Sequence, residues 1–224
     1  QSALESNTAS NNTALGHGAA GFNTTGTGIT ALGRATLSSN TTGSNNIGVG
    51  QGALQSNTTA SNNTAVGYQA GYSGTTSADN TYLGFQAAFS TTTSYGSNVA
   101  VGNRSLYTNT TGYSIVAVGS EALKNNNANN NTAVGYQAGF TNTTGVNITA
   151  VGKGALYSNT ANQNTAVGYH ALYANTTGYY NVATGEQSLL ANTTGLNNTA
   201  YGFSALQANT TASNNVAVGF QAGY

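Results

Sequence analysis

Short β-branched, small and aliphatic residues recur in a fixed order along this chain, each time just before a glycine. Three residues before that glycine stands Thr, Val or Ile, two before it Ala in 11 of 13 copies, and one before it Val or Leu in 11 of 13 copies. Such alternation predicts a short β-strand with the β-branched and Val/Leu positions on one face and Ala on the other. We expect the Thr/Val and Val/Leu face to point into the core and the Ala face to point outward.

The recurring glycine sets a period of 17 residues over the whole chain. It falls at Gly16, Gly33, Gly50, Gly67, Gly84, Gly102, Gly119, Gly135, Gly152, Gly168, Gly185, Gly202 and Gly219. The spacing is 17 throughout, except for one interval of 18 and two of 16. A period this regular is typical of a solenoid, in which each copy forms one coil, here called a rung.

The second half of each copy predicts a further strand and then a turn. Ala often stands three places after the rung glycine and Leu four places after it, as at Ala53 and Leu54, which predicts a second short strand. Asn-Thr-Thr and Gly or Asn follow and predict a turn. The extra residue of the long copy falls near residues 94–97, and the first short copy lacks one near residues 125–131. Length changes survive in loops but shift the register of strands, so this segment is the turn.

No 3.6-residue apolar period is present, and Gly, Asn, Thr and Val disfavour helix. The predicted fold class is therefore all-β, a parallel β-solenoid or β-roll of about 13 rungs with a 17-residue repeat. Residues 1–224 are predicted to form a single repeat domain, and because the chain begins at Gln1 we expect an excerpt of a longer fibre protein.

The apolar groups of one rung are too few to offset the conformational entropy of ordering it. We expect hydrogen bonds between rungs to contribute to stability, including those between stacked side chains in an Asn column. The column comprises Asn40, Asn57, Asn109, Asn126, Asn142, Asn159, Asn175, Asn192 and Asn209. Burial of apolar side chains between several chains would add a third contribution to stability. The small residues of the Ala face, such as Ala65 and Ala133, would allow a second subunit to approach closely, so a homotrimer or lateral self-association is predicted.

Composition excludes several classes of protein. Only 4% of the residues are charged, against about 25% in an average domain, and the net charge is zero. A nucleic-acid partner is therefore not expected. The absence of Cys excludes disulfides and Cys-ligated zinc. No run of 18 apolar residues occurs, so membrane insertion through a helix is not expected.

The block NNTAVG, as in the copy that ends at Gly67, resembles the NSVAIG repeats in the heads of YadA-like trimeric adhesins. Its extended form NTAVGYQA is similar to the NTAVGYQAL strings of viral tail-fibre-type repeat proteins. The resemblance covers the whole chain. It implies parallel β-rolls wound by three chains into an adhesive or spacer rod, located outside the cell, at the cell surface or on a virion.

Candidate chemistry is sparse. The eight charged residues are scattered along the chain, with only Glu121 and Lys124 in the same copy, and His17 and His170 are nine rungs apart. A paired-carboxylate or His-centred site is therefore not expected. The sequence predicts a non-enzyme without a cofactor or a metal.

Aromatic residues gather one and five places after the rung glycine and form a candidate surface contact strip. It comprises Tyr68, Tyr72, Phe85, Phe89, Tyr107, Tyr136, Phe140, Tyr157, Tyr169, Tyr173, Phe203 and Phe220. The structural interpretation is a ladder of rings stacked from rung to rung. The functional interpretation is a strip that binds cell-surface glycans or other fibres.

The sequence favours a structural shaft or spacer of an extracellular or virion fibre, one that presents a binding tip. Two alternatives stay open: a glycan-binding adhesive module that acts through the aromatic columns, and a functional-amyloid-like self-assembling filament. Asn-X-Thr acceptor sequences, such as those at Asn23 and Asn175, would carry glycans if the host were a eukaryote.

Overall fold

The computed structural model describes residues 2–92 and 95–224, and its chain divides into two compact units, residues 1–114 and 115–224. Each copy of the repeat contributes one strand of three residues. Unit 1 holds β1 (Thr13–Leu15), β2 (Thr30–Leu32), β3 (Ile47–Val49), β4 (Thr64–Val66), β5 (Thr81–Leu83) and β6 (Val99–Val101). Unit 2 holds β7 (Val116–Val118), β8 (Thr132–Val134), β9 (Thr149–Val151), β10 (Thr165–Val167), β11 (Val182–Thr184), β12 (Thr199–Tyr201) and β13 (Val216–Val218).

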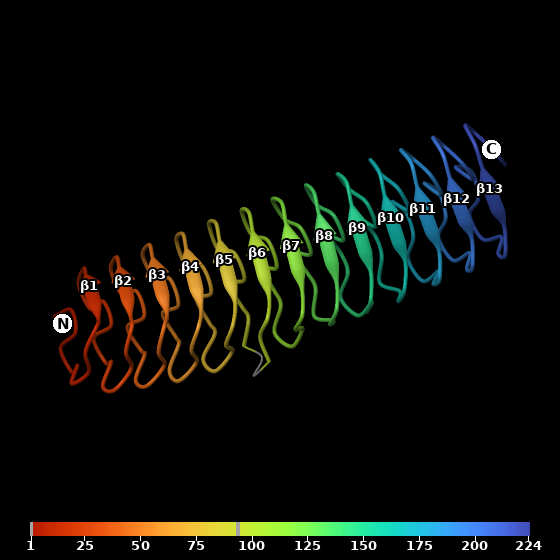
Figure 1. The fold of residues 1–224 in the computed structure, drawn as a ribbon. Helices are drawn as coiled ribbons and strands as arrows, with labels where there is room; N and C mark the ends of the chain where they lie inside the picture. The colour runs from red at the N-terminus through yellow and green to blue at the C-terminus, as the bar shows by residue number, and fades with distance from the viewer. Residues whose placement is uncertain (1, 93–94) are drawn as a thin grey trace. The chain divides into compact units, whose positions relative to one another are not determined.

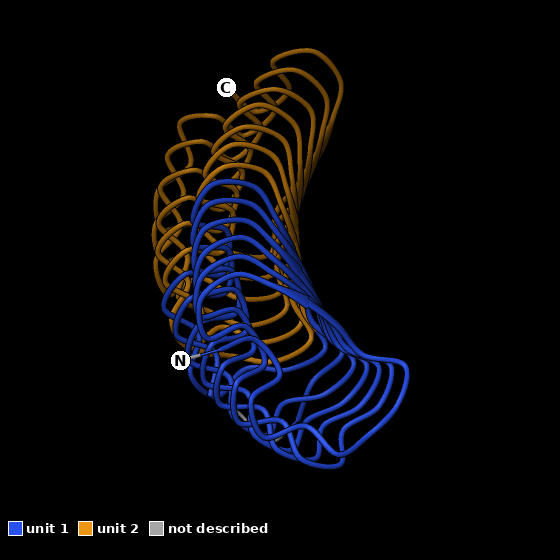
Figure 2. Cartoon of the chain, turned by 90° about the vertical axis from the view of Figure 1, so that its left-hand side faces the viewer, with its two compact units in different colours: residues 1–114 blue, residues 115–224 orange. Residues whose placement is uncertain are grey.

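Within each unit every strand pairs in parallel with the strand of the next rung, and like residues face each other (Figure 1). Ala14 lies opposite Ala31, for example, and Val151 lies opposite Val167. Successive coils of one unit follow nearly the same path (Figure 2). The described residues include no helix. The prediction of an all-β parallel β-solenoid with a repeat of about 17 residues is confirmed. Both units are built from the same repeat, and a single repeat domain over residues 1–224 stays a prediction.

The strand faces are the reverse of those expected from the alternation. The central residue of each strand, which is Ala in all strands except β3 and β5, points inward, and Ala65 and Ala133 are fully buried. The β-branched and aliphatic residues on either side point outward, with Ile47 41% and Leu83 47% exposed. The interior is too shallow for larger side chains at the central position, because the turns of the opposite wall lie close to it. The expected docking of a second subunit on the Ala face is therefore wrong.

The predicted second strand is replaced by a run of β-turns. Ala53 donates its amide to the carbonyl of Gly50, and Asn57 donates to that of Leu54. The residues two and four places after the rung glycine have positive φ, as Gln69 at 52° and Leu54 at 50° do. Strand residues do not adopt such angles. The Leu of this segment still lies in the core as expected, since Leu54, Leu156 and Leu172 are buried.

The position of the missing residue is confirmed for the first short copy. Asn126 and Asn142 contact each other across 16 residues, whereas Asn131 contacts Ile148 across 17. The deletion therefore lies between Asn126 and Asn131, inside the turn. For the long copy, part of the predicted segment, Ser94, lies outside the described residues.

The expected Asn column is a ladder of buried amides. In unit 2, Asn142 donates its Nδ2 to Oδ1 of Asn126 at 2.7 Å, and Asn175 donates to Asn159 at 2.8 Å. The same Nδ2 groups also donate to a carbonyl of their own turn, as Asn175 does to Gly178. These Asn side chains are fully buried, so each turn is closed by an amide that also bonds to the neighbouring rung.

A second ladder, which the sequence analysis missed, is formed by the Asn directly before each strand. Asn181 accepts the backbone N–H of Asn198 at 3.0 Å and donates its Nδ2 to the carbonyl of Gly195 at 2.9 Å. Asn46 and Asn63 make the equivalent contacts in unit 1. Both partners belong to the next rung, so this ladder also joins consecutive rungs. Ile29, Ile115 and Ile148 replace Asn in this column and are buried.

Departures from the repeat compensate one another around Tyr82, which stands where other strands have Ala. Its ring is buried, and a Cβ added to Gly71 would come within 2.7 Å of it. Gly71 and Ala88 occupy positions where most rungs have Leu, and Thr91 stands where most have Asn. Smaller neighbours therefore make room for the phenol. Its hydroxyl and that of Thr91 are buried without a hydrogen-bond partner among the described residues.

A smaller compensation links Gly48 of β3 with Thr36 of the preceding turn. A Cβ on Gly48 would lie 2.5 Å from Cγ2 of Thr36. Most other rungs have Ala at both positions. The methyl group of Thr36 therefore fills the space that an Ala at position 48 would occupy.

This complementarity predicts strong coupling between positions 36 and 48. Gly48→Ala alone should destabilise the chain by roughly 1–3 kcal/mol, because overpacking strains a close-packed core. The double variant T36A/G48A, which restores the Ala–Ala pair of the other rungs, should recover most of that loss. Urea unfolding of the two single variants and the double variant measures the coupling; additive effects would contradict the assigned packing.

Removal of one Asn side chain from the middle of the first amide ladder should lower the stability of the chain. Asn159 takes part in four hydrogen bonds, to Asn142, Ala161, Asn164 and Asn175. Asn159→Ala should lower the free energy of unfolding by about 2–4 kcal/mol, since several buried polar groups lose their partners. Asn209, which is less buried and takes part in two such bonds, serves as the control and should cost less.

Candidate functional site

Ten of the twelve rings of the aromatic strip stack from rung to rung, as the structural interpretation predicts, whereas Tyr136 and Tyr169 lie beside Lys153 instead. Tyr68 stacks on Phe85 with ring centroids 5.4 Å apart, and Phe203 stacks on Phe220 at 5.3 Å. Five places after the rung glycine, Phe89 lies between Tyr72 and Tyr107 at 5.0 and 5.3 Å. Similarly, Tyr157 lies between Phe140 and Tyr173 at 5.1 and 4.9 Å. The rings of the first column are exposed, and those of the second are half-buried.

Stacking changes what this strip offers to a ligand. Rings inside a ladder turn their faces to each other, with interplanar angles of 4–17° among these stacked pairs, and leave mainly edges toward solvent. Cations occupy further ring surface: Arg104 lies 5.6 Å from the Tyr107 ring and Lys153 lies 5.7 Å from the Tyr169 ring. A sugar stacks on a ring face, so the ladder interiors are poor stacking sites.

The charged residues stay dispersed. Lys124 and Glu121 form an ion pair at 2.6 Å within one turn, and Gln137 donates to the same carboxylate. Among residues 2–92 and 95–224, no three His, Cys, Asp or Glu side chains gather as a metal site would require. In the same residues no helix is long and apolar enough to cross a membrane.

His170 lies between aromatic rings of its own rung. Its ring stacks on Tyr169 at 3.9 Å and contacts Tyr173 at 4.5 Å. Burial, followed by the positive charge of Lys153, lowers the pKa of His170, and Glu186 acts in the opposite direction. The folded chain therefore favours the neutral imidazole.

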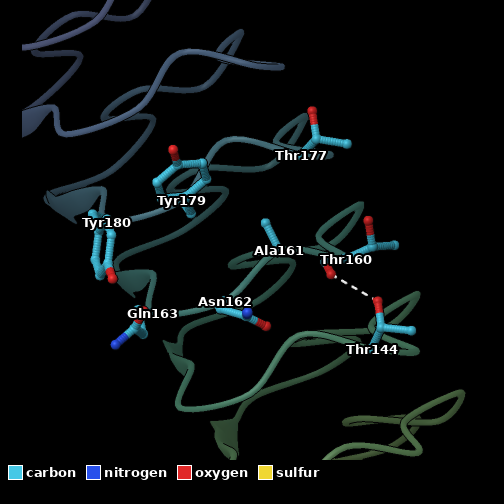
Figure 3. A pocket seen from close by; sticks show the side chains of 8 residues that line it. All are labelled: Thr144, Thr160, Ala161, Asn162, Gln163, Thr177, Tyr179 and Tyr180. Atoms are coloured by element: carbon cyan, nitrogen blue, oxygen red, sulfur yellow. Dashed lines mark hydrogen bonds between the residues drawn. The ribbon is translucent and has the colours of Figure 1, made fainter.

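A hollow in unit 2 brings together residues that the sequence analysis did not single out. Its volume is about 510 Å³, and it lies on the turn side of the second short copy (Figure 3). The lining side chains are Thr144, Thr160, Ala161, Asn162, Gln163, Thr177, Tyr179 and Tyr180. The short rung supplies Thr160 to Gln163, and the neighbouring longer turns supply Thr144 on one side and Thr177, Tyr179 and Tyr180 on the other. The signal in the sequence was the 16-residue spacing from Gly152 to Gly168, followed by two tyrosines in the next turn.

Acceptor sequences with an exposed Asn, such as Asn62, Asn147 and Asn197, remain accessible in this fold, whereas the Asn-Thr-Thr sequences of the first amide ladder are closed to glycosylation. Their Asn side chains are buried and belong to the first amide ladder: Asn23, Asn40, Asn57, Asn142, Asn175 and Asn192. Each amide nitrogen is engaged in hydrogen bonds, as in Asn40 and Asn192. These sequences therefore reflect turn structure, and attachment of a sugar would require the rung to open.

Comparisons with protein-family models, curated proteins and solved structures found no match. The geometry of the chain itself therefore carries the functional argument.

The depressed pKa of His170 predicts that acidification weakens the fold. Below about pH 6.5, the unfolded chain takes up a proton on this residue before the folded chain does. Stability from this group is thus complete above that pH and falls as the pH drops toward the lower folded pKa. His170→Gln, which places there the residue of Gln137 and Gln187, should flatten the pH dependence of the urea midpoint between pH 7.5 and 5. An unchanged slope in the variant would contradict the assignment.

Proposed function

We propose that this chain is a stretch of shaft in an extracellular or virion-borne fibre, a spacer that presents a binding tip carried elsewhere. The observation that supports this proposal best is that the hydrogen-bonding groups of each rung find their partners in the neighbouring rung. Backbone amides bond from rung to rung within each unit, and two series of Asn side chains add such bonds at most rungs. A fold of this kind is extended by adding rungs, as a spacer requires.

The outer strand face supports assembly with further copies of the chain. It consists of the first and third residues of every strand, which are Thr, Val, Ile, Leu and one Tyr, and it carries no charge. Ile47, Leu83 and Val182 are more than 40% exposed on it. In each unit, an uncharged surface that exposes aliphatic side chains in this way marks a contact site. We therefore place the homotrimer interface on the outer strand face instead of the Ala face.

The resemblance to YadA-like adhesin heads and tail-fibre-type repeats agrees with this proposal and with a location outside the cell. Within each unit, consecutive rungs belong to one covalent chain. That arrangement favours a fibre segment of defined length over a filament that grows by open-ended addition of monomers.

The proposal predicts a mass in solution of three times the 22.4 kDa of one chain by light scattering. The variant V151K/V167K should reduce this mass to that of one chain, because it places two charges on neighbouring strands of the outer face. Thr194→Lys, on an exposed turn, is the matched control and should leave the trimer intact. Far-ultraviolet dichroism checks that the variants keep their β structure.

A wild-type mass of one chain would overturn the trimer. Loss of the trimer in T194K as well as V151K/V167K would show that the outer strand face is not the interface.

A further inference from the structure

We propose that the hollow between Thr144 and Tyr180 binds a neutral sugar residue of a glycan. This site is separate from the aromatic strip and from the outer strand face, and the inference does not depend on the shaft proposal. Its volume of about 510 Å³ lies within the ~300–1,000 Å³ range of small-molecule sites. All of its lining residues belong to unit 2.

The hollow exists because one rung is shorter than its neighbours. The contact from Asn175 to Asn159 spans 16 residues, whereas that from Asn181 to Asn164 spans 17. The deletion therefore lies between Asn159 and Asn164, and the turn of this rung is recessed between two longer turns. Asn162 and Gln163 line the hollow from the short rung, and Tyr179 and Tyr180 line it from the next turn (Figure 3).

The two tyrosines differ from the ladder aromatics in how their rings are placed. Tyr179 and Tyr180 meet edge to face at 74°, with centroids 5.1 Å apart, and are 43% and 51% exposed. Neither ring is covered by a parallel partner of the kind seen in the ladders. The face of an aromatic ring is electron-rich and attracts the weakly positive C–H groups of a sugar.

Tyr180 also occupies a position that disfavours a bulky side chain. Its φ is 59°, and the equivalent residues of other rungs are Asn, Gly, Ser, Asp or Gln, as at Gly28, Asn147 and Asn197. Asn and Gly tolerate this left-handed conformation, whereas a bulky residue there is an outlier. The exposed ring of Tyr180 gains little burial in return. Backbone strain that is not offset by a gain in burial is characteristic of functional positions.

The polar groups of the hollow suit hydroxyl groups without charge. Asn162 accepts the N–H of Val146 through Oδ1 at 3.0 Å, which leaves its Nδ2 without a partner among the described residues. The side-chain amide of Gln163 and the hydroxyl of Thr177, two residues that line the hollow, likewise have no hydrogen bond within the described chain. Together they provide donors and acceptors for several sugar hydroxyls. No charged residue lines the hollow, so a neutral sugar fits better than a sialic or uronic acid.

The chain contains a matched control for this site. The first short rung is followed by a turn with Val146 and Asn147 at the positions that Tyr179 and Tyr180 hold after the second short rung. The variant Y179V/Y180N therefore copies a turn that the fold already accommodates. Because Asn tolerates the positive φ at position 180, its Tm should equal or exceed that of the wild type, by about 2 °C.

The test is binding of the fluorescently labelled chain to a glycan microarray of neutral and acidic glycans. We expect the wild type to bind at least one neutral glycan, and Y179V/Y180N to lose at least tenfold of that signal. Gln163→Gly copies Gly28 and removes the side-chain amide of Gln163 from the hollow, so it should weaken binding several-fold. The variant Y68Q/Y72Q should bind as the wild type does, because it alters the aromatic strip and copies Gln51 and Gln55.

Three results would overturn the proposal: no neutral glycan is bound, acidic glycans alone are bound, or binding persists in Y179V/Y180N. Loss of binding in Y68Q/Y72Q, with retention in Y179V/Y180N, would assign recognition to the aromatic strip instead. Monomeric or trimeric mass has no bearing on these outcomes, so failure here is distinguishable from failure of the shaft proposal.

Discussion

The structure depends on the pairing of buried Asn amides between consecutive rungs. An unpaired buried amide would be costly, yet most rungs place an Asn of each of the two columns in the interior. The cost is avoided because each amide meets partners at the equivalent position of the adjacent rung, as Asn175 meets Asn159 and Asn181 meets Asn164. This constraint explains why the period is nearly invariant and why changes in length are confined to the turn between the two columns. It also explains why buried Asn-Thr-Thr sequences recur without serving as glycan acceptors.

A second constraint is the shallowness of the interior. With Ala inside each strand and Ala and Leu on the opposite wall, side chains of successive rungs interdigitate with little room to spare. Deviations therefore occur in compensating sets. Tyr82 is accompanied by smaller residues at Gly71 and Ala88, and Thr36 is accompanied by Gly48. Gly71 and Tyr82, like Thr36 and Gly48, are separated by 11 or 12 residues in sequence but lie against each other across the interior of the coil.

The surface divides into parts with different consequences for function. The outer strand face is uncharged and apolar and suits contact with identical chains, in agreement with a fibre shaft. In the aromatic ladders the ring faces stack on one another, so these residues contribute mainly to contacts between rungs. A glycan is better recognised where the repeat is interrupted. There a shortened turn leaves a recess, and the rings of Tyr179 and Tyr180 are not stacked in a ladder.

The sequence by itself determined the period, the positions of the strands, the turn that tolerates length changes, the Asn ladder seven places after the rung glycine and the stacking of aromatics. These follow from local chemistry repeated at equal spacing, which places like residues over like residues. Only the tertiary structure decided which strand face is inside, because alternation separates two faces without saying which is buried. The distance to the opposite wall settles that question, and it admits Ala alone at most rungs. The tertiary structure also decided that Leu54 and its equivalents lie in turns, since their positive φ depends on bends that close the coil. The hollow beside Tyr180 arises from the difference in length between adjacent rungs, a relation between segments that no single copy of the repeat contains.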